Sequence, residues 1–300
     1  MKLLIIGANG FIGGNAVVFF ADKGYEVDGC DVVVDDSLRE RNIMLLSDSQ
    51  PDFGRFFTDN SYDICLNASG LAHVGFSFDN PEKDFELNVL NVNKILVAIR
   101  KFNPKCKFIN FSSAAVYGNP VKLPIAEDAD TKPLSPYGFH KLQSEYLLKE
   151  YSKFFGLHTC SLRVFSAFGP RLKKQLFWDM YQKSLQGSHI ELFGTGEESR
   201  DFIFIEDLLE AVELVIKHGN FEGEVINVAS GTEITIKEAA EIFYGLLNPG
   251  ISFSFTGKIK MGDPNNWKAD ITLLQKMGFV TKHNLETGLK KSVKWIKENG

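Results

Sequence analysis

The chain has 300 residues, of which 44% are hydrophobic and 24% charged, with a net charge of −5. These values fit a globular protein of one large or two modest domains. No basic stripe is interleaved with stacking aromatics, so we expect no nucleic-acid partner. No apolar run approaches the length of a membrane-spanning helix, and the leading MKLLII is too short for a signal peptide. We therefore expect a cytoplasmic protein with no membrane partner.

Cysteine and histidine give no sign of a disulfide framework or a metal site. Cys30, Cys65, Cys106 and Cys160 fall in or at the end of predicted strands, and none forms a C-x-x-C pair. We therefore expect four buried, reduced thiols. The six histidines are scattered without metal-ligand spacing, so no metal centre is expected.

Predicted strands and helices alternate along the first half of the chain. The predicted strands are 2–6, 25–30, 62–67, 105–111 and 157–164, and the predicted helices are 11–23, 81–102 and 136–155. Such alternation indicates an α/β fold whose parallel sheet is covered on both faces. After about residue 165 the pattern becomes irregular. We expect a first domain at 1–165, to which later segments could return, and a smaller lobe at 166–300 over the carboxyl ends of the strands.

A glycine-rich turn follows the first predicted strand. The apolar run 1–6 leads into Gly7, Gly10 and Gly13, and an amphipathic segment follows. In this context glycines allow a tight turn, let backbone N–H groups approach a pyrophosphate, and let the helix pack close to the strand. The positive end of the helix then faces the anion. We interpret the segment as a dinucleotide-binding turn rather than as an ordinary glycine-rich loop.

The second predicted strand ends at Asp31, 18 residues after Gly13. An acidic residue at this place can accept hydrogen bonds from both ribose hydroxyls and repels a 2′-phosphate. The sequence therefore favours NAD as the cofactor. Arg39 and Arg41 follow closely and could hold a 2′-phosphate if the loop folds back, so NADP is the less favoured alternative.

A serine and a tyrosine–lysine pair form the candidate catalytic set. Ser113 follows a predicted strand, and Tyr137 lies 24 residues later, four residues before Lys141. Four apart in a predicted helix, the last two share one face. A phenol with a pKa of about 10 is a poor base at neutral pH, and a nearby ammonium favours its ionised form. Each motif alone is weak, since such spacing is common in surface helices and a serine pair after a strand is usually a turn.

Taken together, these features resemble the extended short-chain dehydrogenase/reductase family, in particular its NAD-dependent nucleotide-sugar epimerase/dehydratase branch. The resemblance covers nearly the whole chain. It rests on ordered motifs that include FSSAAVYG (111–118), PYGFHK (136–141), LRVFSAFGPR (162–171), GTGEESRDFIFIEDL (194–208) and INVASG (226–231). It implies a Rossmann-type doubly wound parallel sheet that binds NAD, and a smaller C-terminal α/β lobe that binds a nucleotide-diphosphate sugar.

The resemblance also implies roles for individual residues. Tyr137 is the acid/base for a sugar hydroxyl, Lys141 lowers the pKa of Tyr137 and binds the nicotinamide ribose, and Ser113 orients the same hydroxyl. Hydride passes between the sugar carbon and the nicotinamide. The expected cofactor contacts are Gly7, Gly10, Phe11, Ile12, Gly13, Asp31, Ala68, Tyr137 and Lys141, and the expected substrate contacts are Asn88, Ser113, Ser166, Arg200 and Lys260.

Two of the expected substrate contacts have structural alternatives. A guanidinium fork suits the geometry of a diphosphate, so Arg200 is expected to bind it. The alternative is a surface arginine paired with Asp201 or Glu198. Asn88 matches an asparagine of the family's cleft, and the alternative is a structural bond from its side chain to the backbone.

Three places depart from the commonest pattern of this branch. Ala114 and Ala115 stand where a 4,6-dehydratase carries Asp-Glu, and a decarboxylase also carries Glu here, so the chain is expected to perform neither reaction. Ser166 replaces an asparagine. Lys260 replaces a phosphate-binding arginine and offers a point charge without bidentate contact. The nucleotide and the sugar stay open.

The sequence therefore predicts an NAD-dependent nucleotide-sugar 4-epimerase. The alternatives are an NAD(P)-dependent nucleotide-4-keto-sugar reductase or nucleotide-sugar 4-dehydrogenase and, less favoured, a non-catalytic NAD-binding regulatory protein. Relatives commonly form homodimers through the helices predicted at 81–102 and 136–155, so we expect a homodimer. Leu142, Tyr146 and Leu147 could supply its apolar face, although the same spacing serves an intramolecular core.

Overall fold

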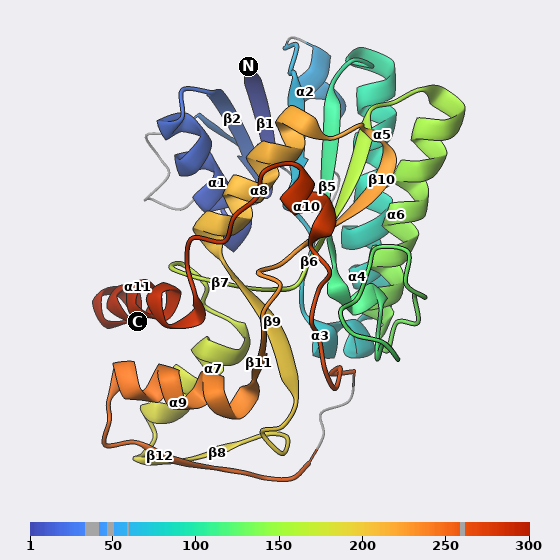
Figure 1. The fold of residues 1–300 in the computed structure, drawn as a ribbon. Coiled ribbons are helices and arrows are strands. Elements are labelled where there is room, and N and C mark those ends of the chain that lie inside the picture. The colour runs from blue at the N-terminus through green and yellow to red at the C-terminus, as the bar shows by residue number, and fades with distance from the viewer. Residues whose placement is uncertain (34–41, 47–50, 59, 259–261) are drawn as a thin grey trace.

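The computed structural model describes residues 1–33, 42–46, 51–58, 60–258 and 262–300. A seven-stranded sheet, parallel throughout, forms the centre of the larger part of the molecule (Figure 1). Its strands are β1 (Lys2–Ile6), β2 (Glu26–Asp31), β3 (Ile43–Leu45), β4 (Ile64–Asn67), β5 (Lys107–Ser113), β6 (Thr159–Val164) and β10 (Glu222–Val228). The α/β Rossmann-type sheet expected from the sequence is confirmed.

The strand order is β10-β6-β5-β4-β1-β2-β3. The chain therefore leaves β1 toward β2 on one side and later returns to β4 on the other. In sheets of this kind ligands bind outside the carboxyl ends of the strands where the order reverses, here at β1 and β4. Strand β10 comes from the C-terminal part of the chain and pairs with β6. The division at residues 165 and 166 itself stays a prediction.

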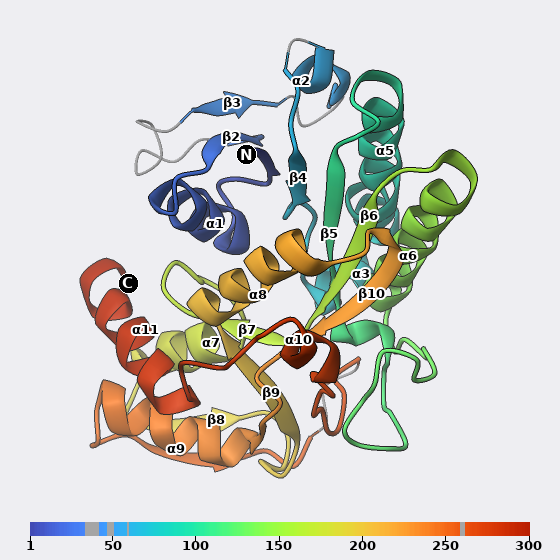
Figure 2. The ribbon, with the colours of Figure 1, turned by 45° about the horizontal axis from the view of Figure 1, so that its top comes forward.

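Alternate side chains of β1 enter two separate cores. Leu3 and Ile5 pack with helices α1 (Phe11–Asp22) and α8 (Ile205–His218). Their neighbours on the strand pack with α2 (Gly54–Thr58), α5 (Asn91–Phe102) and α6 (Pro136–Phe155). Figure 2 shows α1 and α8 on one side of the sheet and α5 and α6 on the other. Both faces are covered, which explains why β1 is apolar on both sides.

A smaller lobe lies beyond the carboxyl ends of the strands, below the large sheet in Figure 1. It contains the sheet β11-β9-β7 and the parallel pair β12-β8. Its strands are β7 (Ser166–Phe168), β8 (His189–Leu192), β9 (Ser199–Phe204), β11 (Glu233–Thr235) and β12 (Ser252–Phe255), and its helices are α7 (Gln175–Ser184), α9 (Ile236–Leu247) and α11 (Leu285–Asn299). The short α10 (Thr272–Lys276) packs against β10 and α8.

The helix predicted at 81–102 is interrupted. It consists of α4 (Pro81–Phe85), a π-helical turn (Glu86–Leu90) and α5. The helix predicted at 136–155 is confirmed as α6. It begins after Ser135, which caps the first turn by accepting the Gly138 N–H at 3.1 Å, and it ends at Gly156, which adopts a left-handed conformation. The short β3, α2 and α3 (Val74–Asp79) were not predicted.

All four cysteines are buried and free, as expected, and Cys106 directly precedes β5. No group of side chains that could hold a metal ion occurs in the described part of the chain. Among the same residues, no helix is both long and apolar enough to cross a membrane.

Candidate active site

The glycine turn between β1 and α1 forms a cradle that side chains would fill. Gly7 has φ of +82°, and a Cβ there would lie 2.6 Å from the Ser69 backbone nitrogen. A Cβ on Gly13 would lie only 2.0 Å from the Gly7 carbonyl oxygen. Gly10 is the N-cap of α1 without a side-chain cap, and the first turn holds no acidic residue. The N-terminus of α1 therefore presents backbone N–H groups suited to a pyrophosphate.

The other residues predicted for the cofactor lie around this cradle. Phe11 and Ile12 open helix α1. Ala68 follows β4, and its N–H donates to the Ile6 carbonyl at 2.8 Å. The Ala68–Ser69 peptide also limits the space above Gly7. The ends of β1 and β4 therefore meet where the sequence predicted the cofactor.

Asp31 ends β2 beside the same turn. Its Oδ2 accepts the Asn9 N–H at 2.8 Å, and its Oδ1 accepts the Val32 N–H at 2.7 Å. These bonds fix the carboxylate, and each oxygen keeps a lone pair for a ribose hydroxyl. Arg39 and Arg41, the residues that could favour NADP, lie outside the described residues.

The predicted catalytic residues meet at the carboxyl end of β5. Ser113 is the last residue of β5, and its Oγ accepts the Ala115 N–H at 3.2 Å. Gly138 lets α6 approach closely, since a Cβ there would lie 2.7 Å from the Ala115 carbonyl oxygen. This approach brings Tyr137 to Ser113, and the two side chains are hydrogen-bonded. Lys141 donates from Nζ to the Phe111 carbonyl at 2.9 Å, with Nζ 5.8 Å from the centre of the Tyr137 ring.

Burial governs the ionisation of this pair. Desolvation raises the pKa of Tyr137 to about 12, while the hydrogen bond with Ser113 lowers it and the charge of Asp84 raises it. Desolvation lowers the pKa of Lys141 to about 8. The negative charges of Asp84 and Glu145 raise this pKa, and the positive charge of Lys174 lowers it further. Among protein groups alone, burial thus raises the Tyr137 pKa more than Ser113 lowers it, and the lowering that Lys141 was expected to cause stays a prediction.

Asn88 lies in the π-helical turn and faces the loop after β4. Its side-chain N–H donates to the Leu71 carbonyl at 3.3 Å, and a Cβ on Gly70 would lie 2.5 Å from its Oδ1. That oxygen is buried and has no hydrogen-bond partner among the described residues. The structural bond considered as the alternative is therefore present, and a free acceptor remains. Wide helical turns of this kind are frequent at functional sites.

The expected substrate residues come from the smaller lobe. Ser166 begins β7 and is half-buried. Arg200, on β9, donates to the Ser199 and Asn265 carbonyls at 2.8 and 3.3 Å and lies 5.5 Å from the centre of the Trp267 ring. Lys260 lies outside the described residues.

The carboxylates proposed as surface partners of Arg200 are hydrogen-bonded elsewhere. Asp201 accepts from Ser230, Gly231 and Ala269, and Glu198 accepts from the loop at Thr195. Desolvation lowers the pKa of Arg200, against the attraction of Asp263 and Glu198. A partly desolvated guanidinium of this kind is suited to a phosphate.

Sequence reasoning missed three charged features near Tyr137 and Lys141. Asp84 and His140 form a hydrogen-bonded pair at 2.6 Å. Lys174 precedes α7, and desolvation lowers its pKa. Glu145, one turn after Lys141, is paired with the buried Arg163 at 2.7 Å. His140 and Glu145 stand in the helix that the sequence predicted, but only their spacing from Lys141 could have drawn notice.

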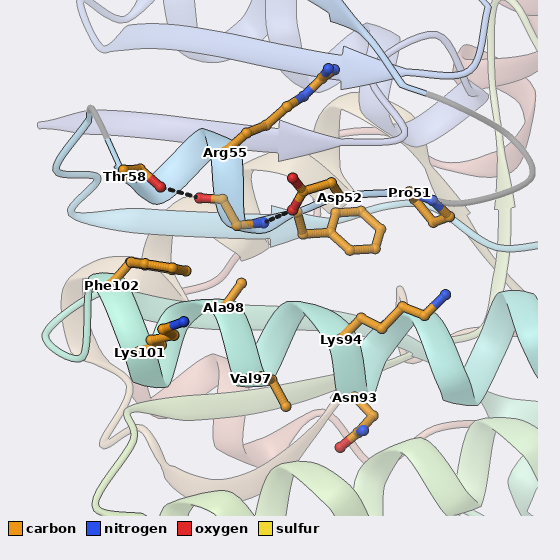
Figure 3. A pocket seen from close by; sticks show the side chains of 12 residues that line it. Pro51, Asp52, Arg55, Thr58, Asn93, Lys94, Val97, Ala98, Lys101 and Phe102 are labelled. Carbon is orange, nitrogen blue, oxygen red and sulfur yellow. Dashed lines mark hydrogen bonds between the residues drawn. The ribbon is translucent and has the colours of Figure 1, made fainter.

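A separate hollow lies between α2 and α5 (Figure 3), with a volume of about 650 Å³. Its walls include Asp52, which precedes α2, and Gly54, the first residue of α2. Lys94 and Lys101 on α5 form part of the opposite wall. The residues predicted for cofactor and substrate do not line it. It lies away from the carboxyl ends of the strands and is not part of the candidate active site.

Comparisons with known proteins agree with this geometry. A putative UDP-glucose 4-epimerase of Methanocaldococcus jannaschii is 26% identical, with 99% of each chain covered. A UDP-N-acetylglucosamine 4-epimerase from Methanobrevibacter ruminantium, solved with UDP-N-acetylmuramic acid, is 28% identical, with TM-score 0.89 and coverage of 100% of this chain and 99% of that one. A UDP-glucuronic acid 4-epimerase from Bacillus cereus, solved with UDP-glucuronic acid and NAD, is 25% identical, with TM-score 0.89 and 99% of each chain covered.

The family comparison covers most of the chain. The sequence model of the NAD dependent epimerase/dehydratase family matches residues 3–229. This span contains the glycine turn, the β5 edge, the Tyr–Lys helix and Arg200. The chain therefore belongs to the NAD dependent epimerase/dehydratase family.

Proposed function

We propose that this protein is an NAD-dependent nucleotide-sugar 4-epimerase. The observation that carries the proposal is the meeting of Ser113 and Tyr137 at the carboxyl end of β5, with Lys141 one helical turn away. The names of the similar proteins support the reaction, since UDP-sugar 4-epimerases are among them. Ala114 and Ala115 support it too, because alanines cannot remove water as an acid pair would.

The residues present fit NAD. The cradle at Gly7 and Gly13 admits backbone but no Cβ, and Asp31 is fixed with free lone pairs at the place of a ribose. When bound, the nicotinamide supplies the hydride acceptor and donor. The chain holds the pyrophosphate at the N-terminus of α1 and the nicotinamide ribose at Lys141.

The proton chemistry falls to Tyr137. Its phenol oxygen accepts the proton of the sugar 4-hydroxyl while the carbon–hydrogen bond gives up hydride, and it returns the proton when the hydroxyl re-forms on the other face. A pKa of about 12 has to fall for this step. The hydrogen bond from Ser113 acts in this direction, and so do positive charges close to the phenol, namely the Lys141 ammonium and the oxidised nicotinamide.

The substrate diphosphate is assigned to the smaller lobe. Arg200 is the proposed contact, since its guanidinium lies against Trp267 and is partly desolvated. Ser166 and Asn88 are proposed for the sugar or its nucleotide, and Lys260 for the second phosphate contact. Replacement of Arg200 by Ala should raise KM for the nucleotide sugar with little change in kcat.

Product analysis tests the reaction directly. Purified protein with NAD is incubated with UDP-glucose, UDP-N-acetylglucosamine and UDP-glucuronic acid in turn, and the sugars are identified by proton NMR. Conversion to the 4-epimer without net change in NADH absorbance is the expected result. A stoichiometric change in NADH would instead indicate a dehydrogenase or reductase. Cofactor binding without turnover on the whole panel would point to a regulatory protein.

A homodimer through α5 and α6 is also proposed. These helices pack side by side and expose Val97, Phe139 and Tyr146, whereas Leu142 and Leu147 are half-buried against the chain's own cores. Contiguous exposed apolar residues mark protein interfaces. Light scattering should give a dimeric mass that Tyr146→Glu reduces to a monomeric one. Val280→Glu, at a site that is also exposed and lies far along the chain, should leave the dimer intact.

A cytoplasmic location is proposed on chemical grounds. All four cysteines are free, and burial raises the pKa of each thiol. Unpaired buried cysteines suit a reducing compartment. Fractionation of cells that produce the protein should place it with soluble cytoplasmic enzymes.

A further inference from the structure

Asp84 and His140 form a buried hydrogen-bonded pair beside the proposed catalytic residues. The Asp84 side chain is fully buried, and that of His140 is 13% exposed. His140 Nδ1 lies 2.6 Å from Asp84 Oδ2. Since an ionised carboxylate only accepts hydrogen bonds, the ring carries the proton at Nδ1. The Phe85 ring covers the imidazole edge-on, with centroids 5.5 Å apart.

The pair adjoins the proton-transfer residues through α6. His140 follows Tyr137 by three residues, so the two lie close together on the helix surface, and it directly precedes Lys141 in the sequence. Helix α4, which carries Asp84, packs against α6. The charge of Asp84 raises the pKa of Tyr137 and of Lys141. The carboxylate therefore opposes ionisation of the phenol and favours the ammonium.

The hydrogen bond with His140 satisfies only one of the two carboxylate oxygens of Asp84. Its Oδ1 is buried and has no hydrogen-bond partner among the described residues. A buried carboxylate is costly unless it is paired and hydrogen-bonded. A proton on both ring nitrogens of His140 would supply the compensating charge, whereas a neutral imidazole would leave a net negative charge that acts on Tyr137.

The neighbouring elements carry few other charges toward the pair. Helix α4 packs against α3, the π-helical turn and α6. Besides Tyr137 itself, the titratable groups there and in the first turns of α6 are His73, Asp79, Glu82, Lys83, Glu86, Lys141 and Glu145, with Lys174 acting on Lys141 from the segment before α7. Lys83 and Glu86 pair with each other at 3.1 Å. Asp84 is the charged group that acts on Tyr137.

We propose that Asp84 and His140 are a positioning pair for Tyr137 and Lys141, in which His140 balances the charge of Asp84 while negative charge develops on the Tyr137 oxygen. This inference rests on the proposed function of Tyr137 as the acid/base. Neither residue touches the substrate in this role. Asp84 favours the charged form of Lys141, and His140 prevents the same carboxylate from holding the Tyr137 proton in place.

Two substitutions that are expected to shift the pH–kcat profile in opposite directions test the pair. In His140→Gln the carboxylate stays without a compensating charge, so the rising limb of the pH–kcat profile should move to higher pH by about one unit. In Asp84→Asn the negative charge is gone, and the limb should move to lower pH. In the double variant the effect of His140→Gln should vanish, since it requires the carboxylate. KM for the nucleotide sugar should change little in any of them.

The chain offers a matched control in a pair that does not act on the Tyr137 or Lys141 pKa. His283 Nδ1 lies 3.1 Å from Oδ1 of the buried Asp207, and its side chain is 17% exposed, close to the value for His140. His283→Gln thus breaks a histidine–aspartate pair of the same kind and should leave the pH profile unchanged. Shifts of the same sign in His140→Gln and Asp84→Asn, or shifts no larger than in the control, would overturn the proposal. Circular dichroism shows whether each variant folds.

A second readout separates this inference from the proposed function. In NAD-bound protein with isotope-labelled tyrosine, NMR follows ionisation of Tyr137, and the Tyr137→Phe variant assigns its signal. The phenol should ionise at higher pH in His140→Gln and at lower pH in Asp84→Asn. This holds even if none of the tested sugars is converted, an outcome that would count against the epimerase alone. An unchanged Tyr137 titration in both variants would refute the pair.

Discussion

The glycine turn after β1 and the proposed catalytic edge after β5 lie at the same end of the sheet but differ in the kind of group that forms them. The turn consists of backbone held in a narrow space, where Gly7 and Gly13 have no room for a Cβ. The edge consists of buried polar side chains, Tyr137, Lys141 and Asp84, whose charges act on one another. The first site is defined by shape and the second by charge balance.

This contrast has a practical meaning for mutation and for pH. A shape-defined site is damaged by one added methyl group and responds little to pH. A charge-defined site keeps its shape when one oxygen or nitrogen is exchanged, but the ionisation of every member changes. The predictions below test whether the two sites respond in these different ways.

The largest effect is expected at the charge-defined site. Tyr137→Phe removes one oxygen and with it the acid/base, so kcat should fall by about 10³-fold. The ring still fills its space, so NAD affinity and the unfolding temperature should stay close to those of the wild type. Steady-state kinetics and calorimetric NAD titration measure both. Retention of most turnover would show that another group moves the proton.

The next effect tests the shape-defined site. In Gly13→Ala the new methyl group would meet the Gly7 carbonyl oxygen at 2.0 Å, so the turn has to distort. We expect NAD affinity to fall by about 100-fold and the free energy of unfolding by about 1–3 kcal/mol. Calorimetry and thermal unfolding give the two values.

Gly245→Ala is the matched control for Gly13→Ala. Gly245 lies in α9, and a Cβ there meets nothing within 4 Å. The substitution should leave NAD affinity unchanged and stabilise the protein by about 0.5–1 kcal/mol. Equal losses of NAD binding in both variants would remove the distinction between a shaped turn and a generally sensitive backbone.

A smaller effect is expected where shape and charge meet. In Asp31→Asn, one side-chain oxygen remains to accept a backbone N–H, but the carboxylate that repels a 2′-phosphate is lost. The dissociation constant for NAD should rise by about tenfold, since bonds to a charged group are the stronger ones. The ratio of NADP to NAD affinity should rise as well. An unchanged ratio in calorimetric titrations would contradict the assignment of Asp31 to the ribose.

The smallest effect concerns stability and pH. The folded pKa of Lys141 is lowered to about 8 by burial, below the ordinary 10.5. Between these values the unfolded chain binds the proton and the folded one does not, so this lysine makes stability rise with pH in that window. Below pH 8 its buried charge costs stability. Lys141→Met should therefore raise the unfolding temperature at pH 7 by about 2–6 °C, a gain that shrinks above pH 8.

The same substitution should lower turnover, since the ammonium that supports Tyr137 ionisation is lost. Lys149→Met, at an exposed position of the same helix, serves as the control and should change neither property. A loss of stability in Lys141→Met at pH 7 would show that its bond to the Phe111 carbonyl outweighs the cost of its charge.

How far the sequence predicts these two sites follows from how they are built. The glycine turn is local, so its spacing after an apolar run was enough to predict Gly7, Gly10, Gly13 and Asp31 as cofactor contacts. Tyr137 and Lys141 are also local to one helix. Asp84 and His140 are 56 residues apart and meet only because α4 packs against α6. No periodic pattern carries such information, although Asp84 does lie four residues before Asn88 in the predicted helix.

Short and irregular elements escaped prediction for a related reason. Strand β3 has three residues and α2 has five, too few to display a period. The π-helical turn was hidden because apolar residues continue through it at nearly helical spacing. Lys174 precedes α7 without a pattern around it, and only the folded lobe brings its charge near Lys141.

The π-helical turn at Glu86–Leu90 rotates the side chains of α4 around the helix axis relative to those of α5. Each residue of an α-helix advances the side chains by about 100° around the axis, so one residue accommodated in a wide turn rotates α4 relative to α5 by that amount. Ile95 and Leu96 thereby face the sheet while Asp84 faces His140. Deleting a single residue here would keep the helix and its apolar face but turn the carboxylate away. The number of residues in the helix thus helps to set the ionisation of Tyr137.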